Sequence, residues 1–329
     1  MIQMQISAHG RLARKTMALT VALTLSASVG FAAVTSSRPA SAAAAAVPSY
    51  SAGIAGESWT IENASACSAT LGAGGNLREG AGWFPGKCQG AGQAPQITGT
   101  SDARALTFRT DKDFRYEGAI VEDPAKNTWK DAAGNTLRDR SELATGWDLP
   151  FHTDVWVGFD VRIPEGVDDV TGSGAYVLQL WQCTANPIGG VRIQSGAGNG
   201  HNLQFVRRGE DPDTNYDISM ATKSIGANEW HSFVIKYNVE PYHDGAPKGR
   251  IAVYHKRVGA TTVEEKLFER EEYFGYATRS TCKDDSFKNE FRIKFGMYKD
   301  YQPGATFRSD FRNVRIGASK AAVQPYNRG

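Results

Sequence analysis

Short stretches in which apolar and polar residues alternate recur from Ala103 almost to the C-terminus. Alternation with a period of two is typical of a β-strand with one buried face. No long segment shows a sustained helical period. The strands that this pattern predicts are Ala105–Phe108, Val155–Ile163, Tyr176–Trp181, Gly190–Gln194, Asn202–Arg207, Trp230–Tyr237, Arg250–His255, Phe291–Tyr298 and Phe311–Ile316.

Turn signals separate these runs. Glycine, proline and aspartate gather at 163–166, 196–200 and 244–247. Many short strands at this spacing predict an all-β fold, a β-jelly-roll sandwich of two antiparallel sheets with a concave substrate groove. We see no internal repeat and no boundary in the middle, so 57–329 is expected to be a single domain. The glycine-rich segment 64–100 at its N-terminal end is expected to be irregular and to be held by disulfide bonds of its cysteines.

The clearest alternation, at 292–301, puts two cations, a glycine and a phenol on one face and three apolar residues on the other. The first set is Arg292, Lys294, Gly296 and Tyr298, and the second is Ile293, Phe295 and Met297. The glycine is expected to leave room beside the phenol for a ligand to approach. A cationic strip around a tyrosine suits an anionic ligand, but for this strand alone a half-solvated edge with ordinary surface charges is the better explanation.

The N-terminus has the pattern of an export signal. Basic residues precede an apolar stretch at 17–34, and Ala40-Ser41-Ala42 offers a cleavage site, with an alternative further along the alanine run. A permanent membrane anchor is the competing interpretation. We expect 1–42 to be a signal peptide, 43–56 to be a flexible tether, and the mature protein to be secreted and extracellular, with no membrane association after cleavage.

Removal of the signal changes the charge of the chain. Residues 1–42 hold four basic residues and no acidic one, so the 37 basic residues fall to 33 against 35 acidic ones. The net charge therefore changes from +2 to −2. This argues against a nucleic-acid partner, and any anion site has to be a local patch.

Four cysteines remain in the mature chain: Cys67, Cys88, Cys183 and Cys282. An even number in an exported protein predicts two disulfides, and three pairings stay open. No Cys-x-x-Cys spacing is present, so we predict no zinc site. Acids such as Asp168, Asp169 and Asp310 are candidate calcium ligands, although scattered aspartates of this kind are usually plain surface.

Polar residues fall on three predicted strands where a simple sandwich does not need them. In an extended run, Arg138, Arg140 and Glu142 share a face; Gln179 and Trp181 point away from the core side of their strand. If these strands neighbour the Tyr298 strand, the shared surface suits a carbohydrate that carries carboxylates. Its members are Arg140, Glu142, Gln179, Trp181, Lys294 and Tyr298.

Other interpretations remain for several of these residues. Arg140 and Glu142 can form a simple cross-strand salt bridge, with Glu142 orienting Arg140. Arg192 either extends the groove, together with Gln194, or lies in solvent. The pair Arg207-Arg208 is expected in a solvated loop, and the acids at 264–272 on the surface.

The order of these motifs resembles the jelly-roll polysaccharide lyases. Arg140-Ser-Glu-Leu, then Gln179 on an apolar strand, then Lys294-x-Gly-x-Tyr298 is similar to the alginate lyases of that fold, the glucuronan lyases and the heparin lyase I-like group. Cys183-Thr-Ala-Asn-Pro187 and the strand from Gly249 to Tyr254 add to the likeness with the last group. The resemblance covers roughly 103–317.

The resemblance implies β-elimination at a uronic acid. Arg140 and Gln179 would neutralise the sugar carboxylate, and Tyr298 would act as the acid and also as a possible base. Lys294 would bind a neighbouring sugar acid, and Trp181 would serve as a sugar platform or groove wall. Preorganised charge and general acid–base catalysis would supply the rate enhancement.

One position departs from the pattern. The family often has Gln-x-His where this chain has Gln179-Leu180-Trp181. Either Tyr298 acts alone, or a histidine from elsewhere takes over. His201 has the parity of a core residue, His152 reads as a loop residue, and His231 is expected to cap a strand.

Two further functions compete with a lyase. A glycoside hydrolase needs two carboxylates, for which Glu142 and Asp300 are the candidates. A non-catalytic carbohydrate-binding protein is the other alternative. We expect a monomer whose partner is an anionic polysaccharide, with no required cofactor; calcium has no support from the sequence.

Overall fold

The computed structural model describes residues 50–52, 83–89, 92–93, 95–99, 105–145, 148–168, 174–182, 187–195, 200–209, 217–242, 245, 247–277 and 289–325. All of them lie in the unit Ala43–Gly329. The predicted signal peptide and the side chains of the four cysteines lie outside the described part. Within the predicted tether, Tyr50–Ala52 form β1 and pair with β18, so these three residues are a strand instead.

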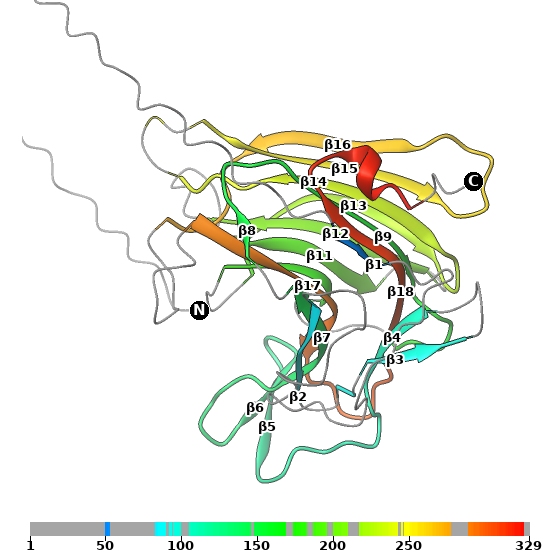
Figure 1. The fold of residues 1–329 in the computed structure, drawn as a ribbon. Coiled ribbons are helices and arrows are strands. Elements are labelled where there is room, and N and C mark those ends of the chain that lie inside the picture. Colours follow the sequence, from blue (N-terminus) through cyan, green and yellow to red (C-terminus); the bar gives the residue numbers. More distant parts are fainter. Residues whose placement is uncertain are drawn as a thin grey trace, which may run out of the picture. The chain divides into compact units, whose positions relative to one another are not determined.

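Two antiparallel sheets pack against each other (Figure 1). The front sheet has the order β13-β12-β11-β10-β17-β7-β2, and β8 pairs with β17 at its end. These strands are β13 (Asp217–Gly226), β12 (Gly200–Arg208), β11 (Gly189–Ser195), β10 (Ala175–Trp181), β17 (Glu290–Asp300), β7 (Arg138–Thr145), β2 (Trp83–Gln89) and β8 (Leu149–Pro150).

The back sheet has the order β16-β15-β14-β9-β18-β4-β3, with β1 paired to β18. Its other members are β16 (Glu265–Glu272), β15 (Gly249–Arg257), β14 (His231–Asn238), β9 (Val155–Arg162), β18 (Arg308–Gly317), β4 (Ala105–Arg109) and β3 (Gln96–Thr98). A separate hairpin of β5 (Ile120–Asp123) and β6 (Thr128–Asp131) lies beyond one end of the sheets, and α1 is a single short helix, Lys320–Val323 (Figure 1).

All nine strands predicted from alternation are present, and the antiparallel two-sheet sandwich confirms the predicted fold class. The core between the sheets is built from their inward positions. On β17 these are Ile293, Phe295 and Met297, each at most 1% exposed. Phe295 meets Phe108 of β4 and Phe311 of β18 with ring centres 5.5 and 5.4 Å apart, so aromatic rings join the front sheet to the back sheet.

Two expectations about charged residues are wrong. Arg207 and Arg208 lie in β12, not in a loop, and are only 1% and 9% exposed. Asp310 is fully buried, where it accepts hydrogen bonds from Thr107, Arg162 and Arg308. Partners from strands distant in sequence help to make these burials tolerable: Glu272 pairs with Arg207, and Thr107 and Arg162 bind Asp310.

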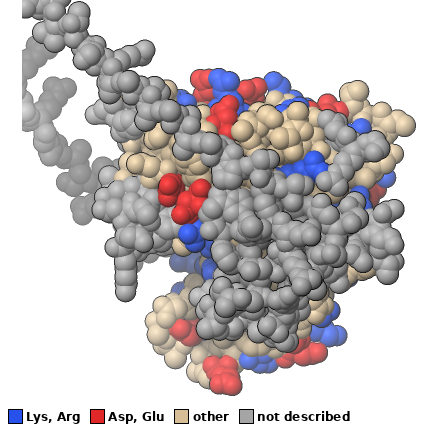
Figure 2. Space-filling view, in the orientation of Figure 1, with Lys and Arg blue, Asp and Glu red and all other residues tan. Residues whose placement is uncertain are grey.

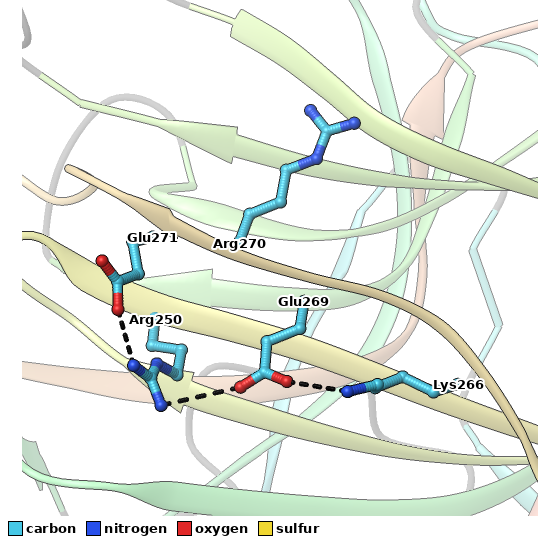
Figure 3. Close-up of a pocket in the computed structure, with 5 residues that line it drawn as sticks. All are labelled: Arg250, Lys266, Glu269, Arg270 and Glu271. Atoms are coloured by element: carbon cyan, nitrogen blue, oxygen red, sulfur yellow. Dashed lines mark hydrogen bonds and ion pairs between the residues drawn. The ribbon is translucent and has the colours of Figure 1, made fainter.

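The surface expectation for the acidic run is confirmed. It forms β16, an edge strand whose residues are exposed or half-buried. Figure 2 shows basic and acidic side chains close together along its upper edge, where Figure 1 places β15 and β16. Figure 3 shows Arg250 between Glu269 and Glu271, with Lys266 on the far side of Glu269. Such an edge resists pairing with another strand.

In the part of the chain that the structure describes, no helix is long and apolar enough to cross a membrane. In the same part of the chain, no group of three or more His, Cys, Asp or Glu side chains is placed to hold a metal ion.

Candidate functional site

The three polar strands of the sequence pattern are neighbours in the middle of the front sheet. β17 lies between β7 and β10, and Tyr298 stands opposite Arg140 on one side and Tyr176 on the other. Tyr298 is half-buried. The sheet topology therefore brings Arg140, Glu142, Gln179, Lys294 and Tyr298 to one region of one face, as the sequence predicted.

Arg140 is held between a carboxylate and the phenol ring. Its Nε lies 3.3 Å from Oε2 of Glu142, and its guanidinium carbon lies 4.4 Å from the centre of the Tyr298 ring. Glu142 is 2% exposed. The salt bridge expected from the sequence is present, but it joins two residues of the same strand, β7, instead of two neighbouring strands. It also orients Arg140 towards the tyrosine.

Gln179 reaches across β17 to the same carboxylate. Its Nε2 donates a hydrogen bond to Oε1 of Glu142, although β10 and β7 are not adjacent. The residue opposite Glu142 on the intervening strand is Gly296. Glu142 thus fixes the arginine and the amide at once.

Gly296 has a different role from the one expected. Its φ is +133°, and a Cβ there would come within 2.4 Å of the Ser141 carbonyl oxygen and 2.6 Å of the Phe108 ring. Only glycine adopts this backbone without strain. The glycine is therefore required by the close approach of the Ser141 backbone and the Phe108 ring, and not by room for a ligand.

Burial raises the pKa of the Glu142 carboxyl, while Lys294, Arg140 and the hydrogen bond from Gln179 act in the opposite direction. The carboxylate is thus taken out of water and is stabilised by two cations and an amide instead. Losing any of these partners leaves a buried charge under-compensated.

Lys294 contacts the residue that stands in place of the expected histidine. Its Nζ lies 4.0 Å from the centre of a Trp181 ring. Both side chains are half-buried. The tryptophan therefore holds the lysine by a cation–π contact and forms one wall of the site.

Tyr176 joins the site although the alternation along its strand predicts a core position. Strict alternation puts it on the core side with Leu178 and Leu180, but the strand register shifts between Tyr176 and Leu178. The irregularity turns Tyr176 to the front, where its ring centre lies 6.5 Å from that of Tyr298. A β-bulge is the kind of feature that alternation alone does not reveal.

Two arginines flank Tyr176. The guanidinium carbons of Arg192 and Arg208 lie 5.6 and 5.9 Å from its ring centre. Arg192 is 7% exposed and donates from Nε to Oε1 of Gln204 at 3.1 Å. Arg192 therefore extends the site across β11 and does not lie in solvent.

The end of the site next to Tyr298 is fixed by two ion pairs. Arg138 pairs with Asp300. Behind them, Lys299 and Asp139 form a pair at 2.8 Å with exposures of 2% and 0%.

The two acids considered for a hydrolase, Glu142 and Asp300, are too far apart. Asp300 lies four residues beyond Gly296, the partner of Glu142, or about 13 Å along the strand. Glycosidase carboxylates lie about 5–10 Å apart.

The three histidines considered from the sequence, His152, His201 and His231, lie away from this region. His201 is 6% exposed and has the core-side parity expected of it. His152 lies in a turn with φ +57°, and its Nδ1 is 2.5 Å from Glu240. It follows β8, which pairs with Glu290, eight residues or about 26 Å along β17 from Tyr298. His231 opens β14 as expected, but it is buried against His255.

The site can therefore neutralise an anion and exchange a proton. Cations outnumber acids on this part of the front face, and a phenol stands among them. The cations are Arg138, Arg140, Arg192, Arg208 and Lys294, and the acids are Glu142 and Asp300. Residues 43–329 together carry a net charge of −2, from 33 basic and 35 acidic residues, so this excess is a local patch.

No protein-family profile and no curated protein sequence matches the chain. Among solved structures it is similar to an endo-β-1,4-glucuronan lyase from the fungus Trichoderma reesei (16% identity, TM-score 0.44, 71% of this chain and 90% of that one). It is also similar to a PL-14 alginate lyase from Aplysia kurodai (12%, 0.42, 68% and 87%).

A third similar structure is the binding domain of Paraclostridial Mosquitocidal Protein 1 (12% identity, TM-score 0.42, 83% of this chain and 49% of that one). Because one architecture hosts unrelated functions, a likeness of this degree does not assign one. The proposal below is built on the side chains of the site.

Proposed function

We propose that this protein is a secreted polysaccharide lyase that cleaves a uronic-acid-containing polysaccharide by β-elimination. The observation that carries the proposal is the grouping of Arg140, Glu142 and Gln179 around the half-buried phenol of Tyr298. The substrate is an anionic polysaccharide, and the chemistry needs no redox cofactor.

The reaction removes the C5 proton of a uronate and breaks the bond between C4 and O4. The C5–H electrons form the C4=C5 double bond, and the departing O4 takes a proton. Arg140 faces the sugar carboxylate and stabilises the charge that develops on it as the proton leaves. Gln179 positions Arg140 indirectly, through the carboxylate of Glu142.

Tyr298 is the proton-transfer group in this proposal. As a phenolate it accepts the C5 proton, and as a phenol it returns that proton to O4, which requires both groups on the same side of the sugar. One residue then serves as base and acid. The distance of His152 and the core-side position of His201 favour Tyr298 acting alone.

The test is an absorbance assay. Purified protein is incubated with glucuronan, alginate, heparin and pectate while the ultraviolet band of a 4,5-unsaturated uronate is followed. We expect a rise with at least one polymer and its loss in Tyr298→Phe. The control is Tyr254→Phe, which removes a hydroxyl from a half-buried tyrosine of the back sheet and should keep full activity.

Other outcomes overturn the proposal in distinct ways. New reducing ends without the absorbance would indicate a hydrolase, and polymer binding without cleavage would indicate a carbohydrate-binding protein. An active Tyr298→Phe variant would remove this residue from the mechanism. An assay with a chelator shows whether calcium contributes, and fractionation of producing cells tests secretion.

A further inference from the structure

A small cavity adjoins Tyr298 on the side away from Glu142. It has a volume of about 50 Å³, and its lining includes Arg138, Tyr176, Pro187, Arg208, Tyr298 and Asp300. Drug-sized ligands occupy pockets of about 300–1,000 Å³. This cavity has room for about three or four water-sized groups, which suits a carboxylate and excludes a whole sugar ring.

The charges around the cavity favour an anion. The acids there have cationic partners: Asp300 pairs with Arg138, and Asp139 pairs with Lys299 behind the wall. Two more guanidinium groups, those of Arg192 and Arg208, stand over the Tyr176 ring. Arg208 is 9% exposed, so its charge is held close to the cavity and is weakly screened.

The cavity and the Arg140 cluster adjoin the same phenol at different points along β17. Glu142, which holds Arg140, stands opposite Gly296, two residues before Tyr298, whereas Arg138 and Asp300 of the cavity lining stand opposite each other two residues after it. We propose that the cavity is a second carboxylate subsite, in which Arg208 and Arg138 bind the acid group of the sugar next to the one that loses its C5 proton.

This inference rests on the proposed function and restricts the preferred substrates to polymers in which two uronates are adjacent. A linkage between two uronates fills both anion sites, whereas a uronate joined to a neutral sugar fills only one. Arg208 then decides specificity without taking part in proton transfer. Its loss removes a charge-assisted hydrogen bond to one carboxylate, an effect of about 10- to 100-fold in binding.

The test compares Arg208→Gln with the wild type on two kinds of oligosaccharide. One consists of contiguous uronates, and the other alternates uronates with neutral sugars. We expect kcat/KM on the contiguous oligomer to fall about 10- to 100-fold, mainly through KM, and to change less than about 3-fold on the alternating one. The control is Arg250→Gln on the back sheet, which should change neither (Figure 3).

Binding separates failure of the subsite from failure of the lyase. Calorimetry with the contiguous oligomer is carried out on wild type and on Arg208→Gln, whether or not the wild type cleaves. Weaker binding only in Arg208→Gln supports the subsite. Equal binding of the oligomer to wild type and Arg208→Gln overturns the subsite, and so does the absence of binding to both proteins. An equal loss of kcat/KM on both oligomers also overturns it. Each of these outcomes is compatible with Tyr298→Phe showing that the protein is a lyase.

Discussion

The guanidinium of Arg140 lies 4.4 Å from the centre of the Tyr298 ring, on a neighbouring strand and 158 positions away in sequence. Neither residue is exceptional by itself. What distinguishes the pair is the buried residue Glu142, which is 2% exposed. It forms a salt bridge with Arg140 and also accepts a hydrogen bond from Gln179. The pair is thereby preorganised before any ligand arrives.

Arg140→Lys tests the geometry of this pair. Lysine keeps the charge but loses the flat group that stacks on the ring while contacting a carboxylate. We expect kcat on the best polymer to fall about 10- to 100-fold with the fold intact, measured by the absorbance assay. Arg312→Lys is the matched control, because Arg312 stacks on Trp230 at 4.3 Å and pairs with Asp160 at 3.0 Å on the back sheet. Equal losses in both variants would contradict a specific role.

Gly296→Ala tests the backbone beneath the site. The new Cβ would meet the Ser141 carbonyl oxygen and Phe108, in a conformation that alanine rarely adopts. We expect the free energy of unfolding to fall by about 2–4 kcal/mol, measured by urea denaturation. Gly118→Ala has a positive φ but nothing within 4 Å, and it should cost about 1 kcal/mol. Similar costs in the two variants would show that the contact with Phe108 does not matter.

The Lys299–Asp139 pair should be strongly coupled. Lys299→Met leaves Asp139 buried without this partner, so we expect a loss of about 3–5 kcal/mol in unfolding free energy. Adding Asp139→Leu should restore much of that loss, since the buried charge is then gone. Lys266→Met, which breaks an exposed pair on β16, serves as the control and should change little. A double variant as unstable as the single one would refute the coupling.

The buried histidine pair predicts a pH-dependent stability. Burial lowers the pKa of both His231 and His255 from 6.5 to about 4, so the folded protein keeps them neutral between those values. The unfolded chain binds protons below about pH 6.5, so their contribution is complete above that pH and is lost as the pH falls towards 4. Between pH 7.5 and 5.5 the loss should be about 1 kcal/mol for each histidine.

The measurement is the urea midpoint at these two pH values. His231→Gln/His255→Gln should show a smaller drop than wild type, although its stability at pH 7.5 is lower because a buried hydrogen bond of 2.9 Å is lost. An unchanged drop in the double variant would mean that other groups set the pH dependence.

Several features of the site were accessible from the sequence because they follow from strand periodicity. Alternation correctly assigned Ile293, Phe295 and Met297 to the core and Lys294 and Tyr298 to the opposite face. It also placed Arg140 and Glu142 on one face of their strand. These assignments are local, since successive side chains of a strand point to opposite sides whatever the rest of the fold does.

Only the tertiary structure decided the rest, because it depends on which strands become neighbours and where their register breaks. The shift beside Leu178 turned Tyr176 towards Tyr298, against the parity of its strand. Arg208, buried in β12, adds a cation to the lining of the cavity that adjoins Tyr298. The sequence by itself thus determined the strands, the faces and the phenol, whereas pairing between distant strands determined what surrounds that phenol, since those contacts form only when the sheet assembles.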